Sequence, residues 1–155
     1  MISCTFIGHR QVFDSGMEQA VYSAIERLIA NESRCVFYVG RAGEYDKICW
    51  KAIHRIKQTY HERIIRSILV EPYMRQSLNT DRNALEALFD EIVIPDELAG
   101  VHYKRAITER NHWMIDRSQY LIAYVHRDFG GAWTAMNYAI KRGLTVYNLA
   151  KLRSR

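Results

Sequence analysis

One glycine pair and one arginine carry the strongest chemical signal in this chain. Gly130 and Gly131 lie between an apolar run that ends at Val125 and a following helical pattern. Glycines at a strand-to-helix junction leave backbone N–H groups open to an anion, and the helix N-terminus adds partial positive charge. Arg110, placed in the same crevice, would supply a planar and permanently charged clamp for phosphate. This segment predicts a ligand of the nucleotide type.

Arg110 and Asn111 belong to a helical pattern over Ala106–Ser118. Apolar residues at helical spacing share their face, so both polar groups point into the protein or toward a ligand. A buried charge needs a partner. Either a bound ligand or an internal salt bridge, to Asp46 or Asp116, would satisfy the guanidinium.

Two further glycine turns follow the first two predicted strands, and both contain basic residues. Because the carboxyl ends of parallel strands meet at one edge of a sheet, we expect all three glycine turns around one crevice. A histidine in such a turn is a general acid, a ligand contact or a residue bonded to backbone. The arginines bind phosphate or point to solvent. The candidate ligand-binding residues of these two turns are Gly8, His9, Arg10, Gly40, Arg41 and Gly43.

Two carboxylates follow the second of these turns. Glu44 and Asp46 fall in the first turn of a predicted helix, where a negative charge favours the helix dipole. If either enters the crevice, it can stabilise or attack the cationic transition state of N-glycosidic cleavage. Both are therefore candidate catalytic residues as well as ordinary helix-start residues.

Strand and helix patterns alternate along the whole chain. This alternation predicts the α/β class, a three-layer Rossmann-like fold with a mostly parallel sheet and helices on both faces. The pattern leaves the strand order open. Helical faces are expected over 17–29 and 45–56 as well as over 106–118. Strands are expected over Ser3–Ile7, Val36–Val39, Ile64–Val70, Glu91–Ile94, Tyr120–Val125 and Thr145–Leu149.

The 155 residues predict a single domain with a polar insertion around 71–103. An insertion beside a parallel sheet shapes either a site or an oligomer contact. Leu85, Leu88 and Phe89 lie at helical spacing within it, so they either cover the sheet or form a two-fold contact. Further apolar residues of the insertion are Tyr73, Met74 and Leu78.

Composition excludes several classes of protein. With 48% hydrophobic and 25% charged residues the chain is globular and not disordered. The 3 cysteines lack CxxC spacing, so neither a disulfide framework nor a metal site is expected. No run is long enough for a membrane span, and we expect a cytoplasmic protein. The net charge of +5, partly from the tail residues Lys151, Arg153 and Arg155, suits an anionic small molecule or nucleic acid.

The stretch ERNHWMIDRSQYLIAYVHRDFGGAWTAMNYA resembles the SLOG superfamily, which includes the LOG phosphoribohydrolases and the DprA-type proteins. The segments CTFIGHR, FYVGRAGEYD and RNHWMID look closer to its uncharacterised DUF1273-like and YpsA-related bacterial branch. Positions that match the LOG pattern are Arg110, Met114, Gly130, Gly131 and Thr134, the last at the phosphate-contacting threonine. Positions that depart from it are Asn111 for a lysine, Phe129 for a proline, Trp133 for a glycine and Asn137 for the catalytic glutamate.

The resemblance implies a Rossmann-like fold that binds a nucleotide or nucleotide derivative, including a ligand-sensing role. An alternative is an N-glycosidic hydrolase or transferase acting on a nucleoside monophosphate or NAD-like compound. Asn137 cannot carry the charge that such a reaction uses, so Glu44, Asp46 or Glu109 would have to replace it. A second alternative is single-stranded nucleic-acid binding of the DprA kind. None of these functions requires a cofactor. SLOG-like proteins commonly pair through helices beside the site, so the resemblance also implies a homodimer of two-fold symmetry.

Overall fold

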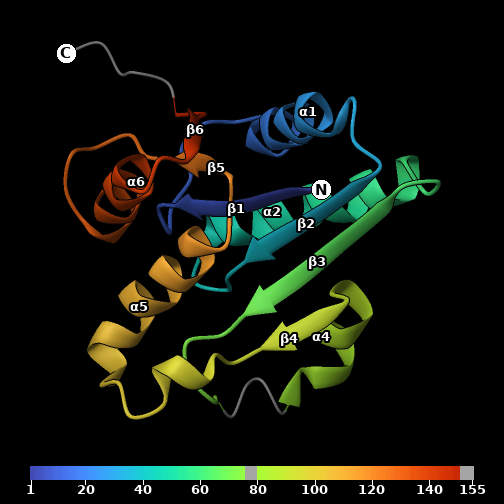
Figure 1. Ribbon diagram of the computed structural model, residues 1–155. Helices are drawn as coiled ribbons and strands as arrows, with labels where there is room; N and C mark the ends of the chain where they lie inside the picture. Colours follow the sequence, from blue (N-terminus) through green and yellow to red (C-terminus); the bar gives the residue numbers. More distant parts are fainter. Residues whose placement is uncertain (76–79, 151–155) are drawn as a thin grey trace.

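The computed structural model describes residues 1–75 and 80–150, which form a three-layer α/β structure around one parallel sheet (Figure 1). This confirms the Rossmann-like class predicted from the sequence. The sheet has six strands in the order β4-β3-β2-β1-β5-β6, and every neighbouring pair is parallel. The strands are β1 (Ile2–Gly8), β2 (Arg34–Val39), β3 (Ile64–Val70), β4 (Glu91–Val93), β5 (Tyr120–Tyr124) and β6 (Thr145–Asn148).

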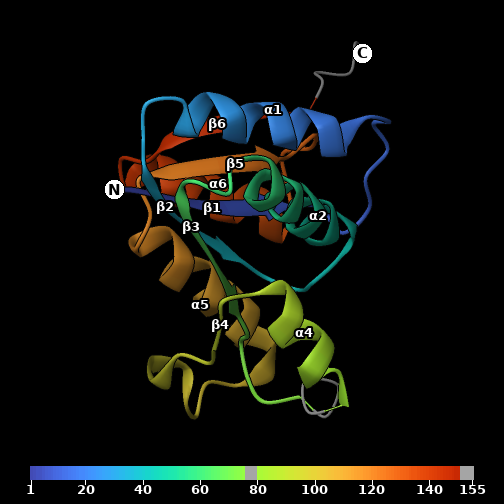
Figure 2. The ribbon, with the colours of Figure 1, turned by 90° about the vertical axis from the view of Figure 1, so that its right-hand side faces the viewer.

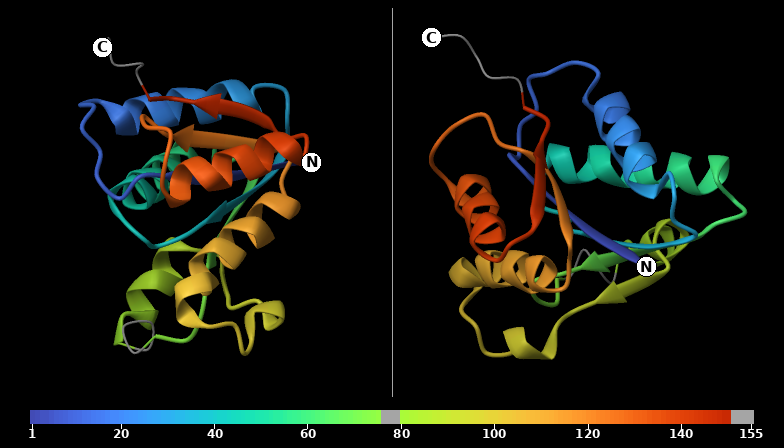
Figure 3. Two further views of the ribbon diagram at one scale, coloured as in Figure 1. Left: turned by 90° about the vertical axis from the view of Figure 1, so that its left-hand side faces the viewer. Right: turned by 45° about the horizontal axis from the view of Figure 1, so that its top comes forward.

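The helices cover both faces of the sheet. Helices α1 (Met17–Ile29) and α2 (Glu44–Thr59) pack on one face, and α5 (Tyr103–Asp116) and α6 (Gly131–Lys141) pack on the other (Figure 3). The short elements α4 (Arg82–Leu88) and η1 (Asp96–Leu98) lie within residues 71–103, the segment that the sequence predicted to be an insertion. Together with β4, α4 lies at the end of the molecule away from α1 and β6 (Figure 2).

Strand periodicity divides the apolar residues between two cores. Along β1, Cys4 and Phe6 join the core under α1 and α2, whereas Ile7 joins the core under α5 and α6. Along β5, Ile122 and Leu121 divide in the same way. Because successive side chains of a strand point to opposite faces, a strand covered on both sides reads as a continuous apolar run.

The strand order creates a switch point at the centre of the sheet. The chain runs outward from β1 through β2 and β3 to β4, then returns to β5 on the other side of β1. The crossovers on the two sides of β1 therefore lie on opposite faces of the sheet. In open parallel sheets such a point leaves a crevice beyond the carboxyl ends of the two central strands. Here those ends belong to β1 and β5.

The apolar helix of the insertion covers the sheet edge. Leu85 and Phe89 are buried, and the Phe89 ring makes an edge contact with Trp50 of α2 at 5.6 Å between centroids. Leu88 stays exposed. Leu78 and the basic tail lie outside the described residues. None of the described helices is both long and apolar enough to cross a membrane.

Candidate functional site

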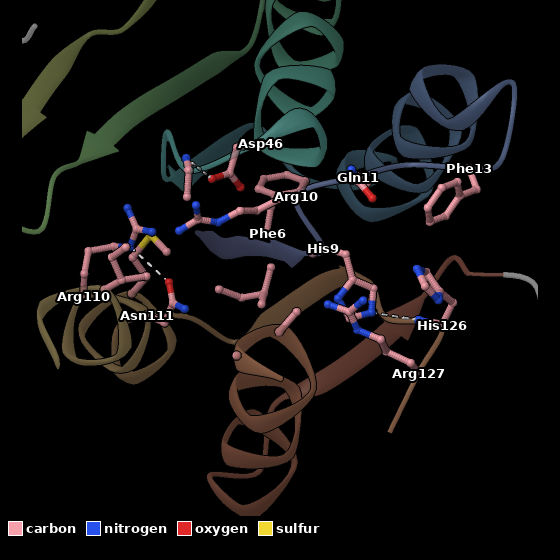
Figure 4. A pocket seen from close by; sticks show the side chains of 17 residues that line it. Phe6, His9, Arg10, Gln11, Phe13, Asp46, Arg110, Asn111, His126 and Arg127 are labelled. Carbon is pink, nitrogen blue, oxygen red and sulfur yellow. Dashed lines mark hydrogen bonds between the residues drawn. The ribbon is translucent and has the colours of Figure 1, made fainter. Parts of the chain in front are cut away.

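A cavity of about 480 Å³ lies at the switch point (Figure 4). Its walls come from the end of β1 and the loop after it, from the first turns of α2 and α6, and from one face of α5. Asp46 and Arg110 lie toward one end of the cavity, whereas His9, His126 and Arg127 lie toward the other. The cavity thus has two ends of different chemistry.

His9 joins the two central strands at the floor of the cavity. The backbone N–H of His9 donates to the Tyr124 carbonyl (3.2 Å). The ring Nε2 of His9 accepts the backbone N–H of His126 (3.2 Å). Since Nε2 is an acceptor, the neutral ring carries its proton on Nδ1. His9 is 5% exposed, and burial, together with nearby His126 and Arg127, lowers its pKa from 6.5 to about 4. His9 is therefore uncharged at neutral pH.

Arg110 is a buried guanidinium, 2% exposed, on the face of α5 that the sequence predicted. Its Nη1 donates to the Val70 carbonyl (2.9 Å) and its Nε to Asn111 Oδ1 (3.0 Å). Burial lowers its pKa, and the negative charge of Asp46 is the largest opposing influence. No carboxylate of residues 1–75 or 80–150 lies within 4.0 Å of it, so neither Asp46 nor Asp116 forms the internal salt bridge considered from the sequence.

Asp46 is a buried carboxylate on the cavity wall. It is 8% exposed, and its Oδ2 accepts the Ala42 N–H at 2.8 Å, which fixes the side chain at the start of α2. Burial raises its pKa, and Arg110 is the strongest influence in the opposite direction. Among the described residues, Oδ1 of Asp46 has no hydrogen-bond partner. The cavity therefore contains one fixed, partly unsatisfied acceptor.

The early glycines make room for packing around the cavity. A Cβ on Gly8 would lie 2.2 Å from Cδ2 of Tyr45, and a Cβ on Gly40 would lie 2.5 Å from Nη1 of Arg110. Gly43 lies in the same way against the backbone of Arg10. Of these three glycines, Gly8 lines the cavity. Glycine is therefore required at these three positions because neighbouring residues approach closely, whether or not a ligand also contacts them.

The later glycine pair opens the N-terminus of α6 toward the cavity. Gly130 precedes the helix with a φ of 92°, which favours glycine, and Gly131 lines the cavity. A Cβ on Gly131 would meet nothing within 4 Å. The hydroxyl of Thr134 donates to the Gly130 carbonyl (3.0 Å), outside the cavity lining. The structure thus brings Gly131, but not the Thr134 hydroxyl, to the cavity.

Other predicted site residues lie outside the lining as well. Glu44 Oε2 accepts the Val12 N–H at 2.9 Å and so holds the loop after β1. Arg41 Nε lies 2.7 Å from Oε1 of Glu71, a fully buried carboxylate at the end of β3. Of the two candidate catalytic carboxylates, Asp46 is the one in the cavity wall.

Among the lining residues that sequence reasoning missed are Gln11, Phe13, His126 and Arg127. The exposed Phe13 ring makes an edge contact with His126 at 5.6 Å between centroids. His126 follows β5 much as His9 follows β1, and this symmetry was a usable signal once the strand order was known. The contact between His126 and His9 depends on β1 lying beside β5, and the sequence pattern leaves that strand order open.

The charges of the lining favour an anion. Arg10, Arg110 and Arg127 contribute three guanidinium groups, and Asp46 contributes one carboxylate. Arg10 and Arg127 are exposed and Arg110 is buried, and the Arg10 side chain points toward the end of the cavity that holds Asp46 and Arg110 (Figure 4). The N-terminus of α6 adds partial positive charge at the same place. No group of three or more His, Cys, Asp or Glu side chains in the described ranges is placed to hold a metal ion.

The fold and the switch-point cavity define a Rossmann-like α/β protein of the doubly wound type. The structure is similar to DNA processing protein A (DprA) from Streptococcus pneumoniae, with a TM-score of 0.64 and 15% sequence identity. The likeness covers 94% of this chain but 49% of DprA, so this chain spans about half the length of that protein. At this identity the likeness shows a shared fold. No protein-family model and no curated protein sequence matches the chain significantly.

Proposed function

We propose that the protein binds a nucleotide or nucleotide derivative in the switch-point cavity, in the manner of SLOG-type proteins, and that it acts as a ligand sensor. The observation that carries this proposal is the convergence of three arginines and the N-terminus of α6 on one cavity. Arg127 and the N–H groups at Gly130 and Gly131 hold the phosphate, and Arg110 contributes charge from the far end. Thr134 is the additional phosphate contact that the resemblance implies.

Isothermal titration calorimetry against a panel of mononucleotides, dinucleotides and NAD tests this proposal. We expect Arg127→Ala to weaken binding by about 10-fold or more, because a charge-assisted hydrogen bond to phosphate is lost. Arg82→Ala is the matched control, since Arg82 is an exposed arginine on α4 that pairs with Glu86. Failure of the whole panel to bind the wild-type protein would contradict the proposal.

Membership of the SLOG superfamily is part of this proposal. The matching positions of the sequence and the shared fold with DprA, a SLOG protein, both support it. We further propose the DUF1273-like branch, on the segments CTFIGHR and RNHWMID. A cytoplasmic location fits the three buried, unpaired thiols of Cys4, Cys35 and Cys49.

A second candidate function is N-glycosidic cleavage. Asp46 favours it, since a buried carboxylate with a raised pKa lines the cavity. Asn137 stands at the LOG glutamate position, and its amide donates to the Trp133 carbonyl (2.8 Å) outside the lining. The test is release of free base from AMP, CMP or NAD. Loss of that release in Asp46→Asn, with Glu44→Gln unchanged, is the expected result; no turnover of any of these compounds would refute an enzyme of this kind.

A third candidate is single-stranded nucleic-acid binding. The fold shared with DNA processing protein A and the exposed Phe13 and Phe129 rings near Arg127 favour it. Aromatic rings stack on bases, and arginines neutralise phosphates. Filter binding of a labelled oligonucleotide should then show retention that falls steeply with salt. Absence of retention at low salt would eliminate this candidate.

A further inference from the structure

Two buried polar side chains at the inner end of the cavity each keep one atom without a partner among the described residues. Asp46 uses Oδ2 for the Ala42 N–H, and Arg110 uses Nη1 and Nε for Val70 and Asn111. Within residues 1–75 and 80–150, Oδ1 of Asp46 and Nη2 of Arg110 make no hydrogen bond. Both side chains are more than nine-tenths buried, and both line the cavity.

The backbone holds these two groups apart. Ala42, after β2, fixes the carboxylate, while Val70, at the end of β3, fixes the guanidinium, and the two side chains form no salt bridge within 4.0 Å. A buried charge without its full set of hydrogen bonds is costly. The acceptor Oδ1 of Asp46 and the donor Nη2 of Arg110 line the same cavity but do not bond to each other. Both can therefore bind a third group between them.

The third group must accept from Arg110 and donate to Asp46. A hydroxyl does both, because it carries one hydrogen and two lone pairs. A phosphate does not suit Oδ1 of Asp46, because two negative groups would meet there, although the guanidinium of Arg10 also points toward this end (Figure 4). Phosphate suits the other end, where Arg127 and the N-terminus of α6 lie and where Asp46 is absent (Figure 4). The two ends of the cavity thus match the two ends of a sugar phosphate.

We propose that Asp46 and Arg110 form a ribose subsite, which makes the ligand a ribonucleotide and not a 2′-deoxyribonucleotide. Asp46 accepts the O–H of the ribose 2′-hydroxyl through Oδ1, and Arg110 donates through Nη2 to the oxygen of the 3′-hydroxyl. Acidic side chains select ribose hydroxyls in this way in other doubly wound folds. This inference rests on the proposed nucleotide-binding function and adds the sugar that the site selects.

Loss of one hydroxyl has a measurable effect. A 2′-deoxy ligand leaves Oδ1 of Asp46 buried and unpaired, and a lost hydrogen bond to a charged group weakens binding by about 10- to 100-fold. The Asp46→Asn variant keeps an amide oxygen for the Ala42 N–H and so turns its amino group, which is uncharged, toward the ligand. In that variant the ribose preference should fall by about 5- to 10-fold, because the amino group gives the hydroxyl oxygen only a hydrogen bond between uncharged groups.

The experiment is calorimetry with matched pairs of probes: AMP against 2′-deoxy-AMP and 3′-deoxy-AMP, and the same pairs for GMP and CMP. Wild type, Asp46→Asn and Glu44→Gln are compared, each checked for folding by its melting temperature. Glu44→Gln is the matched control, because Glu44 lies in the same helical turn and bonds Val12 outside the cavity lining. Its ribose preference should equal that of the wild type.

Each outcome decides a different point. If no probe binds the wild-type protein, the nucleotide-binding function fails and the ribose subsite fails with it. If ribose and deoxyribose probes bind equally, nucleotide binding stands and the ribose subsite is wrong. The wild-type comparison needs no variant, so it holds even if Asp46→Asn does not fold. A ribose preference that survives unchanged in Asp46→Asn would assign the selection to another residue.

Discussion

Gly40→Ala tests whether the position of Arg110 depends on the absence of one side chain. A Cβ at residue 40 would lie 2.5 Å from Nη1, 2.8 Å from Cζ and 2.9 Å from Nη2 of Arg110. The backbone of Gly40 lies outside the left-handed region, so alanine is conformationally acceptable there. The perturbation is therefore steric and is directed at one guanidinium.

The expected loss of stability follows from these contacts. If Arg110 moves away, its bond to the Val70 carbonyl is lost, and a hydrogen bond to a charged group contributes about 1.5–3 kcal/mol. Replacing glycine restricts the unfolded chain and returns about 0.4–1 kcal/mol. We expect Gly40→Ala to lower the free energy of unfolding by about 0.5–2.6 kcal/mol, the difference between these ranges.

Urea unfolding followed by circular dichroism measures this change. Gly131→Ala is the control, because nothing lies within 4 Å of its added Cβ, and it should keep or slightly raise the stability. The decisive comparison repeats Gly40→Ala in an Arg110→Met background, where the clash with the guanidinium is absent. An equal penalty in both backgrounds would refute the reasoning, since Arg110 would then not be its cause.

Three further predictions concern other parts of the molecule. Because folding lowers the pKa of His9 to about 4, the unfolded chain binds more protons between pH 6.5 and 4, so stability should fall as the pH falls through that window. His9→Gln keeps an acceptor for the His126 N–H and should flatten this pH dependence in urea unfolding; an unchanged slope would exclude His9 as its source. Tyr45→Phe removes the hydroxyl bond to the Ile122 carbonyl (3.0 Å) in the core and should cost about 1 kcal/mol in thermal unfolding, whereas no loss would mean that the bond contributes nothing net. The homodimer stays a prediction: light scattering should give a dimer mass for the wild type and a monomer mass for Leu88→Glu, and a wild-type monomer at micromolar concentration would contradict it.

The sequence predicts the elements of this fold well and their arrangement poorly. The expected strand Ile64–Val70 is β3 residue for residue, because burial on both faces produces a nearly continuous apolar run, interrupted here by Arg66 and Ser67. The weaker run at Glu91 became an edge strand of three residues, where burial is incomplete. Strand order is not encoded in such runs, since every central strand of a parallel sheet has the same pattern. It depends on which crossovers pack together, and that is a property of the whole chain.

The site was predictable to the same extent. His9 and Arg10 could be placed because they directly follow a strand, whereas Phe13 and His126 enter through the contact between β1 and β5. The glycine turns show another limit: a glycine needed beside Tyr45 and one needed beside a ligand look alike in a sequence. Only the side chains that surround each glycine in the folded protein distinguish a glycine needed for packing from one needed for ligand binding.

The seam between β1 and β5 also bears on how the protein is made. His9 and His126, which bond across it, are 117 residues apart, so the central strand keeps one open edge until most of the chain has left the ribosome. An open strand edge pairs readily with other chains. Truncation or stalling before Tyr120 would leave that edge uncovered and favour aggregation. A small molecule that contacts residues on both sides of this seam binds only the completed fold. Its binding would therefore stabilise the native state relative to the unfolded chain.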